Sequence, residues 1–193
     1  MNTILIMPVK FTSRRLKNKN ILPIKNIPMF IYSLKKVIKS EMIDKFYVST
    51  ESKKIIKICK LYKINYIKRP YYLAGQNIEK QAVIVNALKI LKKRGVKPKV
   101  VISYQANSPE TKLSDLNNAI NFFNKKLFPY YPIKELISVG NDNIQNAAFR
   151  IMTYKAAFQR TLSTKIGIYF TDSKDIHTHK EYIEIKNKIE KKK

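Results

Sequence analysis

The 193-residue chain is poor in several residue types: it has one cysteine, no tryptophan, four glycines, and 13 acidic residues against 39 lysines and arginines. A single cysteine, Cys59, excludes an intrachain disulfide and a zinc site built from thiolates. Cys59 lies in an apolar helical pattern, so we interpret it as a core residue rather than a nucleophile. No apolar run approaches the length of a transmembrane helix, and the first residues show neither a charged leader nor a cleavage site. We therefore expect a cytoplasmic protein with one domain over residues 1–193 and no membrane partner.

The formal net charge of +26 suggests nucleic acid or another polyanion as a partner. The lysines, however, are spread along the chain, and they accompany many isoleucines, asparagines and tyrosines, a composition typical of an AT-rich genome. We therefore do not expect nucleic-acid binding. That alternative rests on charge alone, and it predicts a continuous basic face and a steep salt dependence of binding.

Short apolar runs alternate with amphipathic stretches along most of the chain. Strands are expected at residues 4–7, 45–49, 65–68, 99–104, 136–139, 146–153 and 166–170, and helices at 29–39, 50–62, 77–94, 114–125, 154–159 and 181–193. Thr50 is the predicted N-cap of the second helix, with Glu51 in its first turn. This order predicts an α/β fold, a three-layer sandwich around a mostly parallel, Rossmann-like sheet.

Four polar loops follow predicted strands, at residues 8–20, 50–52, 69–76 and 105–109. Ligands of open α/β sheets bind at the carboxyl ends of the strands, so these loops are expected to meet at one site. In the first loop a buried strand leads directly into cations and hydroxyls, which is a common way to build a phosphate site. The alternative is a solvated basic turn, and the other three loops favour the phosphate site.

Several short motifs occur in a fixed order along nearly the whole chain. They are Pro8-Val9-Lys10 with Ser13 and Lys19-Asn20-Ile21, Val48-Ser49-Thr50-Glu51, Arg69-Pro70 with Leu73-Ala74-Gly75-Gln76, Gln105-Ala106-Asn107-Ser108-Pro109 followed by Asp115, and the segment from Asp175 to Glu181. In this order the chain resembles the sugar-acid cytidylyltransferases, namely the acylneuraminate cytidylyltransferases (CMP-N-acetylneuraminate synthetases) and the related CMP-Kdo synthetases. Arg15-Leu16 is similar to the Kdo branch.

The resemblance implies a domain of the nucleotide-diphospho-sugar transferase type that transfers CMP from CTP to a sialic-acid-like, nonulosonic or ulosonic sugar acid. Pyrophosphate is released, Mg²⁺ is the cofactor, and the product serves surface glycan synthesis in lipopolysaccharide or capsule. CTP and the sugar acid are the expected partners, with a possible homodimer. The implied catalytic residues are Lys10, Arg15 and Lys19; the implied nucleotide-binding residues are Lys10, Ser13, Arg14, Lys19, Asn20 and Ser49; the implied substrate-binding residues are Arg69, Gln105 and Ser108; the implied metal ligand is Asp175.

The chain departs from the family pattern at several positions. Phe11-Thr12 stands where the family has a glycine pair, and Gln76 stands where it has an aspartate. Thr111 replaces an arginine that is expected to bind the carboxylate of the sugar. His177 replaces a second metal-binding aspartate. Histidine is a poor ligand for magnesium. A degenerate homologue that binds nucleotide or a protein partner without catalysis is therefore the alternative. The two interpretations differ in whether a second carboxylate, such as Asp172 or Glu51, lies near Asp175.

Four sets of residues allow a simpler structural interpretation. We interpret His177 and His179 as surface residues rather than a transition-metal pair, and Tyr130 and Tyr131 as loop packing or a dimer contact rather than a stacking surface. Gln105 and Ser108 are equally consistent with a turn at a strand end. Asp175 is nearly as consistent with an acid at the start of a helix as with a metal ligand.

Overall fold

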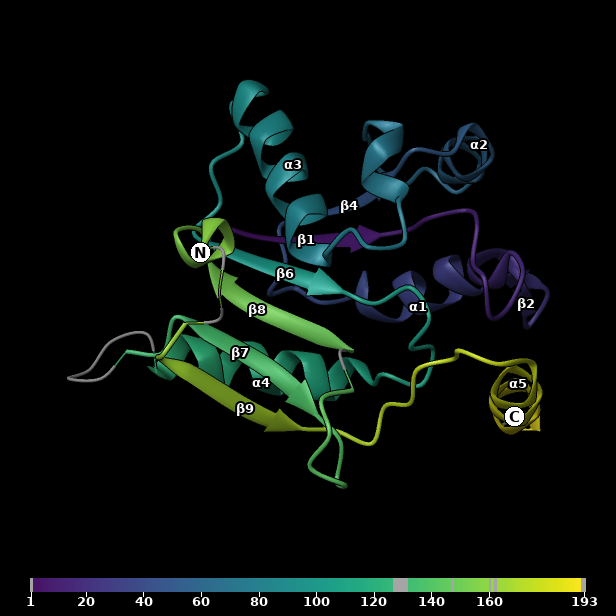
Figure 1. Ribbon diagram of the computed structural model, residues 1–193. Helices are drawn as coiled ribbons and strands as arrows, with labels where there is room; N and C mark the ends of the chain where they lie inside the picture. The colour runs from purple at the N-terminus through teal and green to yellow at the C-terminus, as the bar shows by residue number, and fades with distance from the viewer. Residues whose placement is uncertain (1, 127–131, 147, 160, 162, 192–193) are drawn as a thin grey trace.

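Seven strands form one sheet in the computed structural model, which describes residues 2–126, 132–146, 148–159, 161 and 163–191 (Figure 1). The first three pairings, among β5, β4, β1 and β6, are parallel, and β7 and β9 are also parallel. Strand β8 is antiparallel to both of its neighbours. In spatial order the strands are β5 (Tyr66–Lys68), β4 (Lys45–Thr50), β1 (Thr3–Pro8), β6 (Val100–Tyr104), β8 (Phe149–Thr153), β7 (Glu135–Val139) and β9 (Ile166–Phe170). The sheet is mostly parallel, which confirms the predicted fold class.

Five α-helices connect or follow these strands among the described residues. They are α1 (Met29–Val37), α2 (Lys53–Leu61), α3 (Lys80–Lys93), α4 (Leu113–Lys126) and α5 (His179–Lys191). Short 3-10 turns are η1 (Lys19–Ile21), η2 (Tyr71–Ala74) and η3 (Ala156–Phe158), and a small ribbon pairs β2 (Pro23–Ile24) with β3 (Ile27–Pro28). In the described part of the chain, every helix falls short of the length and apolar content that crossing a membrane requires.

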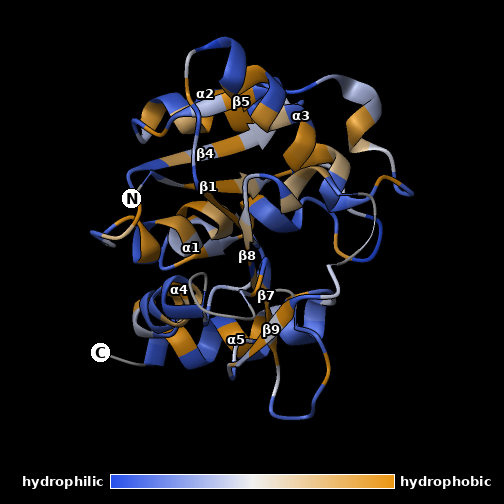
Figure 2. Ribbon diagram, turned by 90° about the vertical axis from the view of Figure 1, so that its left-hand side faces the viewer, coloured by the Kyte–Doolittle hydropathy of each residue, from blue (hydrophilic) through white to orange (hydrophobic). Residues whose placement is uncertain are grey.

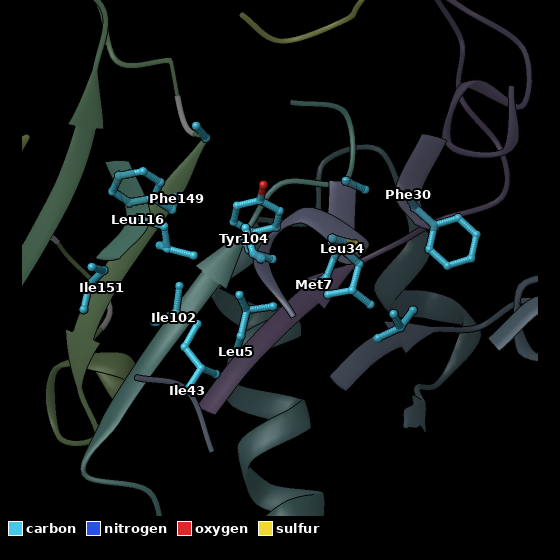
Figure 3. Close-up of a cluster of buried hydrophobic side chains, with 14 of the residues drawn as sticks. Leu5, Met7, Phe30, Leu34, Ile43, Ile102, Tyr104, Leu116, Phe149 and Ile151 are labelled. Carbon is cyan, nitrogen blue, oxygen red and sulfur yellow. The ribbon is translucent and has the colours of Figure 1, made fainter. Parts of the chain in front are cut away.

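Helices cover both faces of the sheet around β1, which makes three layers. Leu5 and Met7 belong to one apolar cluster with residues of α1, α2 and α4, whereas Ile4 and Ile6 belong to a second cluster with residues of α3 and η3. Successive side chains of a strand point to opposite faces, so a strand covered on both faces must be apolar throughout. Figure 3 shows Leu5, Met7 and Leu34 in the first cluster, and β1 is largely orange in Figure 2.

Helix α5 packs away from the sheet, against the β2–β3 ribbon that follows the first loop. Tyr182, Ile185 and Ile189 form a third apolar cluster with Ile24 and Met29. The Tyr182 hydroxyl also donates a hydrogen bond to the Pro23 carbonyl oxygen at 2.7 Å. This anchor carries the preceding segment, residues 171–178, across the carboxyl edge of the sheet (Figure 1).

The predicted start of the second helix needs correction. Helix α2 begins at Lys53, and Ser52 is its N-cap, since the Ser52 Oγ accepts a hydrogen bond from the Ile55 amide at 3.4 Å. Thr50 is instead the last residue of β4, where its carbonyl oxygen accepts a hydrogen bond from the Arg69 amide at 3.0 Å. The predicted N-cap was therefore wrong because strand pairing extends through Thr50, and Glu51 lies outside the helix.

Other boundaries differ from prediction by one to three residues. Helix α5 begins at His179 rather than at residue 181 because Thr178 and Glu181 form a capping box: Thr178 Oγ1 accepts from the Glu181 amide, and Glu181 Oε2 accepts from the Thr178 amide. Strand β8 begins at Phe149 rather than at residue 146, and Asn146 Oδ1 instead accepts a hydrogen bond from the Ser138 hydroxyl. Helix α3 begins at Lys80 rather than at residue 77.

Candidate functional site

A pocket of about 640 Å³ lies at the carboxyl ends of β1, β5 and β6. Three of the four polar loops predicted to converge there line it, and the loop at residues 50–52 does not. Figure 1 shows the arrowheads of β1 and β6 pointing toward the side of the molecule where α5 lies. Among the described residues, the polar or charged ones that line the pocket are Lys10, Thr12, Ser13, Arg14, Arg15, Lys19, Asn20, Arg69, Gln76, Lys80, Gln105, Asn107, Gln145, Asp175 and His177.

Hydrogen bonds from side chains to backbone carbonyl oxygens hold the first loop, with its cations, in the pocket lining. The side-chain amide of Asn20 (Nδ2) donates a hydrogen bond to the Lys10 carbonyl oxygen at 2.8 Å, and Asn18 adopts a left-handed conformation with φ of 56° just before η1. Lys19 Nζ donates to the carbonyl oxygen of Ile176 at 3.0 Å. Burial lowers the pKa of Lys19 to about 8, with Arg15 and Lys10 lowering it further and Asp175 opposing them. A buried, cationic lysine beside other cations favours an anionic ligand.

Asp175 is held in the pocket lining by the loop that follows β6. The Ile176 amide donates to the Asn107 carbonyl oxygen at 2.8 Å, and the Asn107 side-chain amide donates to the Ile176 carbonyl oxygen at 3.0 Å. The Ser108 hydroxyl donates a hydrogen bond to Asp175 Oδ1. Burial raises the pKa of Asp175, while the Ser108 hydrogen bond and the charges of Lys80 and Lys19 lower it. The side chain is 12% exposed, so it is reached mainly from the pocket.

His177 joins this carboxylate to the first loop. Arg15 Nη2 lies 3.2 Å from His177 Nδ1, and because a guanidinium only donates, Nδ1 is the acceptor. His177 Nε2 lies 3.8 Å from Asp175 Oδ2 and carries the proton of the neutral ring. Burial lowers the pKa of His177, as do the charges of Lys19 and Arg15. His177 is a surface residue, with its side chain 36% exposed, but it lies in the lining of the pocket, whereas His179 is exposed beside Tyr182.

Two predicted site residues lie outside the pocket lining. Ser49 is fully buried in β4, and its hydroxyl has no hydrogen-bond partner among the described residues. Ser108 is also fully buried, and it contacts Asp175 rather than the cavity. The other nine line the pocket: Lys10, Ser13, Arg14, Arg15, Lys19, Asn20, Arg69, Gln105 and Asp175. Tyr130 and Tyr131 lie outside the residues that the structure describes.

Arg69 reaches the pocket wall, but its guanidinium is already bound. Nη2 lies 2.7 Å from Glu51 Oε2, and the two side chains are only 2% and 5% exposed. Nη1 donates to the Ser49 carbonyl oxygen at 3.0 Å, and Nη2 also contacts the Val9 carbonyl oxygen at 3.5 Å. The charge of Arg69 is therefore compensated within the protein.

Thr111, which stands where the family pattern has an arginine, is fully buried away from the pocket. Its hydroxyl donates to the Ser108 carbonyl oxygen at 3.0 Å and contacts the Ser173 hydroxyl at 2.6 Å. Lys80, at the first position of α3, lines the pocket instead, and sequence reasoning missed it together with Gln145. A lysine in the first helical turn after the loop at residues 69–76 was the available signal for Lys80. Gln145 has no comparable signal, because no strand ends directly before it.

The carboxylates near the pocket limit how a metal is held. Asp175 is the one carboxylate among the described residues that line it, and in that part of the chain no group of three or more His, Cys, Asp or Glu side chains is placed to bind a metal. Glu51 is paired with Arg69, and Asp172 contacts Asn141 and lines a separate hollow of about 300 Å³. Neither is a described partner of Asp175. Magnesium is often held by one or two carboxylates together with substrate phosphates and water, so the donor set fits when phosphates complete it.

Comparisons with known proteins concern the family and the fold of the chain. The sequence profile of a family described as Cytidylyltransferase matches residues 4–191. An N-acylneuraminate cytidylyltransferase from Escherichia coli is 32% identical over 87 residues, which cover 45% of this chain and 21% of that protein. A Helicobacter pylori protein, pseudaminic acid cytidylyltransferase and UDP-2,4-diacetamido-2,4,6-trideoxy-beta-L-altropyranose hydrolase, is 32% identical over 75 residues, covering 38% of this chain and 14% of that protein. The matches thus span about a fifth or less of these relatives' lengths.

A solved structure shows the same fold over the whole chain. The CMP:2-keto-3-deoxy-manno-octonic acid synthetase in complex with CTP superposes with a TM-score of 0.81, covering 100% of both chains at 9% sequence identity. At that identity the likeness concerns the fold alone.

Proposed function

The chain belongs to the cytidylyltransferase family, and from this premise we propose that it transfers CMP from CTP to a sugar acid of the sialic-acid, nonulosonic or ulosonic class and releases pyrophosphate. The observation that carries the proposal is the pocket itself, in which Asp175 faces the cations of residues 10–19 at the carboxyl edge of the sheet. The relatives named for acylneuraminate and pseudaminic acid support an acidic sugar as the acceptor. The product would serve surface glycan synthesis in lipopolysaccharide or capsule.

The proposed reaction is an in-line displacement at phosphorus. A sugar hydroxyl attacks the α-phosphorus of CTP and loses its proton to water, a new O–P bond forms, and the bond from the α-phosphorus to the bridging oxygen breaks as pyrophosphate leaves. Such chemistry needs mainly alignment and compensation of phosphate charge. The proposed phosphate ligands are Lys10, Ser13, Arg14, Arg15 and Lys19, and their shared place in the pocket lining supports this role.

Asn20 can also accept a hydrogen bond, in addition to the one that it donates to Lys10. Its Oδ1 is buried and has no hydrogen-bond partner among the described residues. Because Asn20 lines the pocket, this oxygen is an available acceptor for a hydroxyl of the nucleotide ribose. Gln105 lines the pocket at the end of β6 and is a candidate for hydrogen bonding to the sugar.

Asp175 would hold Mg²⁺, with phosphate oxygens completing the coordination. The ion would neutralise charge on the phosphates. Within the protein, Ser108 orients the carboxylate and leaves Oδ2 on the side of His177. Because Thr111 is buried away from the pocket, another cation would recognise the sugar carboxylate, and we propose Lys80, which lines the pocket at the start of α3.

The test measures pyrophosphate release from CTP and Mg²⁺ with a panel of sialic, legionaminic, pseudaminic and Kdo-type acids. Release with one acid is expected, and it should fall by at least about tenfold in Lys19→Ala, which removes a charged hydrogen-bond donor. Asp175→Asn should lose release in the same way. Lys57→Ala, an exposed lysine of α2, is the matched control and should retain activity.

A degenerate, non-catalytic homologue is the second candidate, because one carboxylate lines the described pocket and Thr111 is buried. No release with any acid, together with CTP binding in calorimetry, would support that candidate. Absence of both release and CTP binding would overturn the nucleotide site. A homodimer stays a prediction, and light scattering of the purified protein tests it.

A further inference from the structure

The Glu51–Arg69 ion pair joins the segments that follow three neighbouring strands, two of which line the pocket. Arg69 follows β5, Glu51 follows β4, and their contacts extend to the residues that follow β1. Arg69 Nη1 donates to the Ser49 carbonyl oxygen, which also accepts the Val9 amide at 2.9 Å. A guanidinium with donors in a rigid fork is suited to binding several acceptors at once. The pair is nearly inaccessible to solvent, so water competes little for these hydrogen bonds.

The same pair fixes the backbone on both sides of Lys10. Arg69 Nη2 contacts the Val9 carbonyl oxygen before it, and Glu51 Oε1 accepts a hydrogen bond from the Phe11 amide after it at 3.2 Å. The Lys10 carbonyl oxygen itself accepts a hydrogen bond from the side-chain amide of Asn20. Three consecutive residues are therefore each held by a different side chain, although none of them lies in a regular element.

The next residue, Phe11, adds packing to these polar contacts. Its ring packs against the main apolar cluster, and Lys54 Nζ lies 5.2 Å from the ring centroid. Residues 9–11 are thus anchored on the sheet side, while Lys10 and the following residues Thr12 to Arg15 line the pocket. With residues 9–11 anchored in this way, Lys10, Arg14 and Arg15 remain in the pocket lining.

We propose that the Glu51–Arg69 pair is a clasp that positions residues 9–11, and with them Lys10, for the nucleotide phosphates, and that Arg69 is a positioning residue rather than a substrate ligand. The proposal rests on the proposed function for the identity of the ligand. Its structural part, the anchoring of residues 9–11, does not depend on that identity.

Glu51→Gln distinguishes the clasp from direct substrate binding by Arg69, because the two roles predict opposite changes in CTP affinity. The substitution keeps the shape of the side chain and removes its charge, so the Arg69 charge is no longer compensated. If Arg69 is a substrate ligand restrained by Glu51, the freed charge should tighten CTP binding. If the pair is a clasp, residues 9–11 loosen and CTP binding weakens by about tenfold or more, as expected when a binding group is misplaced.

Arg69→Lys provides a second variant that keeps the positive charge beside Glu51. A lysine has one ammonium group and lacks the fork that reaches Glu51, Ser49 and Val9 together. The clasp therefore predicts the same weakening of CTP binding in Arg69→Lys as in Glu51→Gln. The KM for CTP should rise with little change in kcat, since ground-state positioning is affected.

Glu135→Gln is the matched control, because Glu135 and Arg150 form a second buried ion pair with the same 2.7 Å separation, and neither lines the pocket. Thermal melts verify that each variant is folded. Amide hydrogen exchange of peptides covering residues 9–16 and calorimetric CTP binding are then measured for the wild type and all variants. Faster exchange at residues 9–11 and weaker CTP binding are expected in Glu51→Gln and Arg69→Lys alone.

Three outcomes would overturn the proposal: unchanged exchange at residues 9–11 in folded Glu51→Gln, tighter CTP binding by that variant, or equal weakening of CTP binding in Glu135→Gln. If the wild-type protein binds no CTP, the proposed function is wrong, and exchange at residues 9–11 still decides whether the clasp exists.

Discussion

Ser108 donates a hydrogen bond to Asp175 across 67 residues of sequence, and this contact joins the loop after β6 to the segment before α5. Two hydrogen bonds between Asn107 and Ile176 run beside it. The proposed metal ligand is thereby held on the pocket wall by a loop that sequence reasoning assigned to the sugar.

Ser108→Ala should impair activity through Asp175. The Ser108 hydrogen bond lowers the pKa of Asp175, against burial, which raises it. Removing the hydroxyl therefore raises that pKa, so Asp175 binds a proton at higher pH and the acid limb of the pH–rate profile moves upward. The pH dependence of pyrophosphate release at a fixed, subsaturating Mg²⁺ concentration measures this, because saturating Mg²⁺ would hold Asp175 deprotonated. An acid limb at the wild-type position would contradict the assigned contact.

Lys19 should make CTP binding weaken as the pH rises above neutrality. Its pKa is lowered to about 8 mainly by burial, so it loses its charge within the range from pH 7 to 9. Bound phosphates favour the charged form, and CTP affinity should fall by up to about tenfold per pH unit above pH 8. Calorimetry at pH 7, 8 and 9 measures the trend. The arginine of the Lys19→Arg variant stays charged, so its CTP affinity should depend less on pH. An equally steep pH dependence in that variant would mean that another group titrates.

Cys59 should react with thiol reagents only in the unfolded protein. The side chain is fully buried in α2, and burial raises its pKa to about 12. The thiolate is the reactive form, so both accessibility and protonation suppress labelling. Labelling is followed with a chromogenic disulfide reagent with and without urea. Rapid labelling of the native protein with loss of activity would contradict the interpretation of Cys59 as a core residue.

Glu135→Gln should reduce stability without affecting catalysis. Glu135 is fully buried and pairs with Arg150, whose side chain is 20% exposed. Removing one partner of a buried ion pair typically costs about 3 kcal/mol or more of unfolding free energy, and partial exposure of Arg150 favours the lower end. Urea unfolding measures the loss. Activity per folded molecule should match the wild type, and a specific loss of activity would place this pair in the site.

The elements with strong periodicity were predictable from the sequence. Strand β9 has the predicted bounds, and the apolar runs before residues 8 and 105 are buried strands, as expected. The helix starts were less predictable because they depend on which hydroxyl or carboxylate caps the backbone. Ser52 caps α2 because Thr50 belongs to β4, which pairs with β5. That strand pairing joins segments that are distant in sequence.

The candidate site was predicted unevenly for a similar reason. The positions of Lys10, Lys19 and Asp175 in one pocket follow from strand-to-loop patterns and the family motifs. Pairing of Arg69 with Glu51 was not predicted, because an arginine after a strand has the same local pattern whether its partner is a ligand or a carboxylate 18 residues earlier. His177 and His179 were assigned to the surface because two histidines two residues apart, without further metal ligands nearby in the sequence, do not indicate a metal site, and this pattern says nothing about a pocket.

The amino-acid pattern alone predicts the alternation of strands and helices, the apolar core positions and the chemical character of the loops at the carboxyl edge. These properties depend on local periodicity and turn chemistry, which a short window of residues contains. Which polar side chains line the pocket and which bind one another follows from the folded chain. That choice depends on contacts such as Arg15 with His177, 162 residues apart, which the packing of α5 against the β2–β3 ribbon brings together.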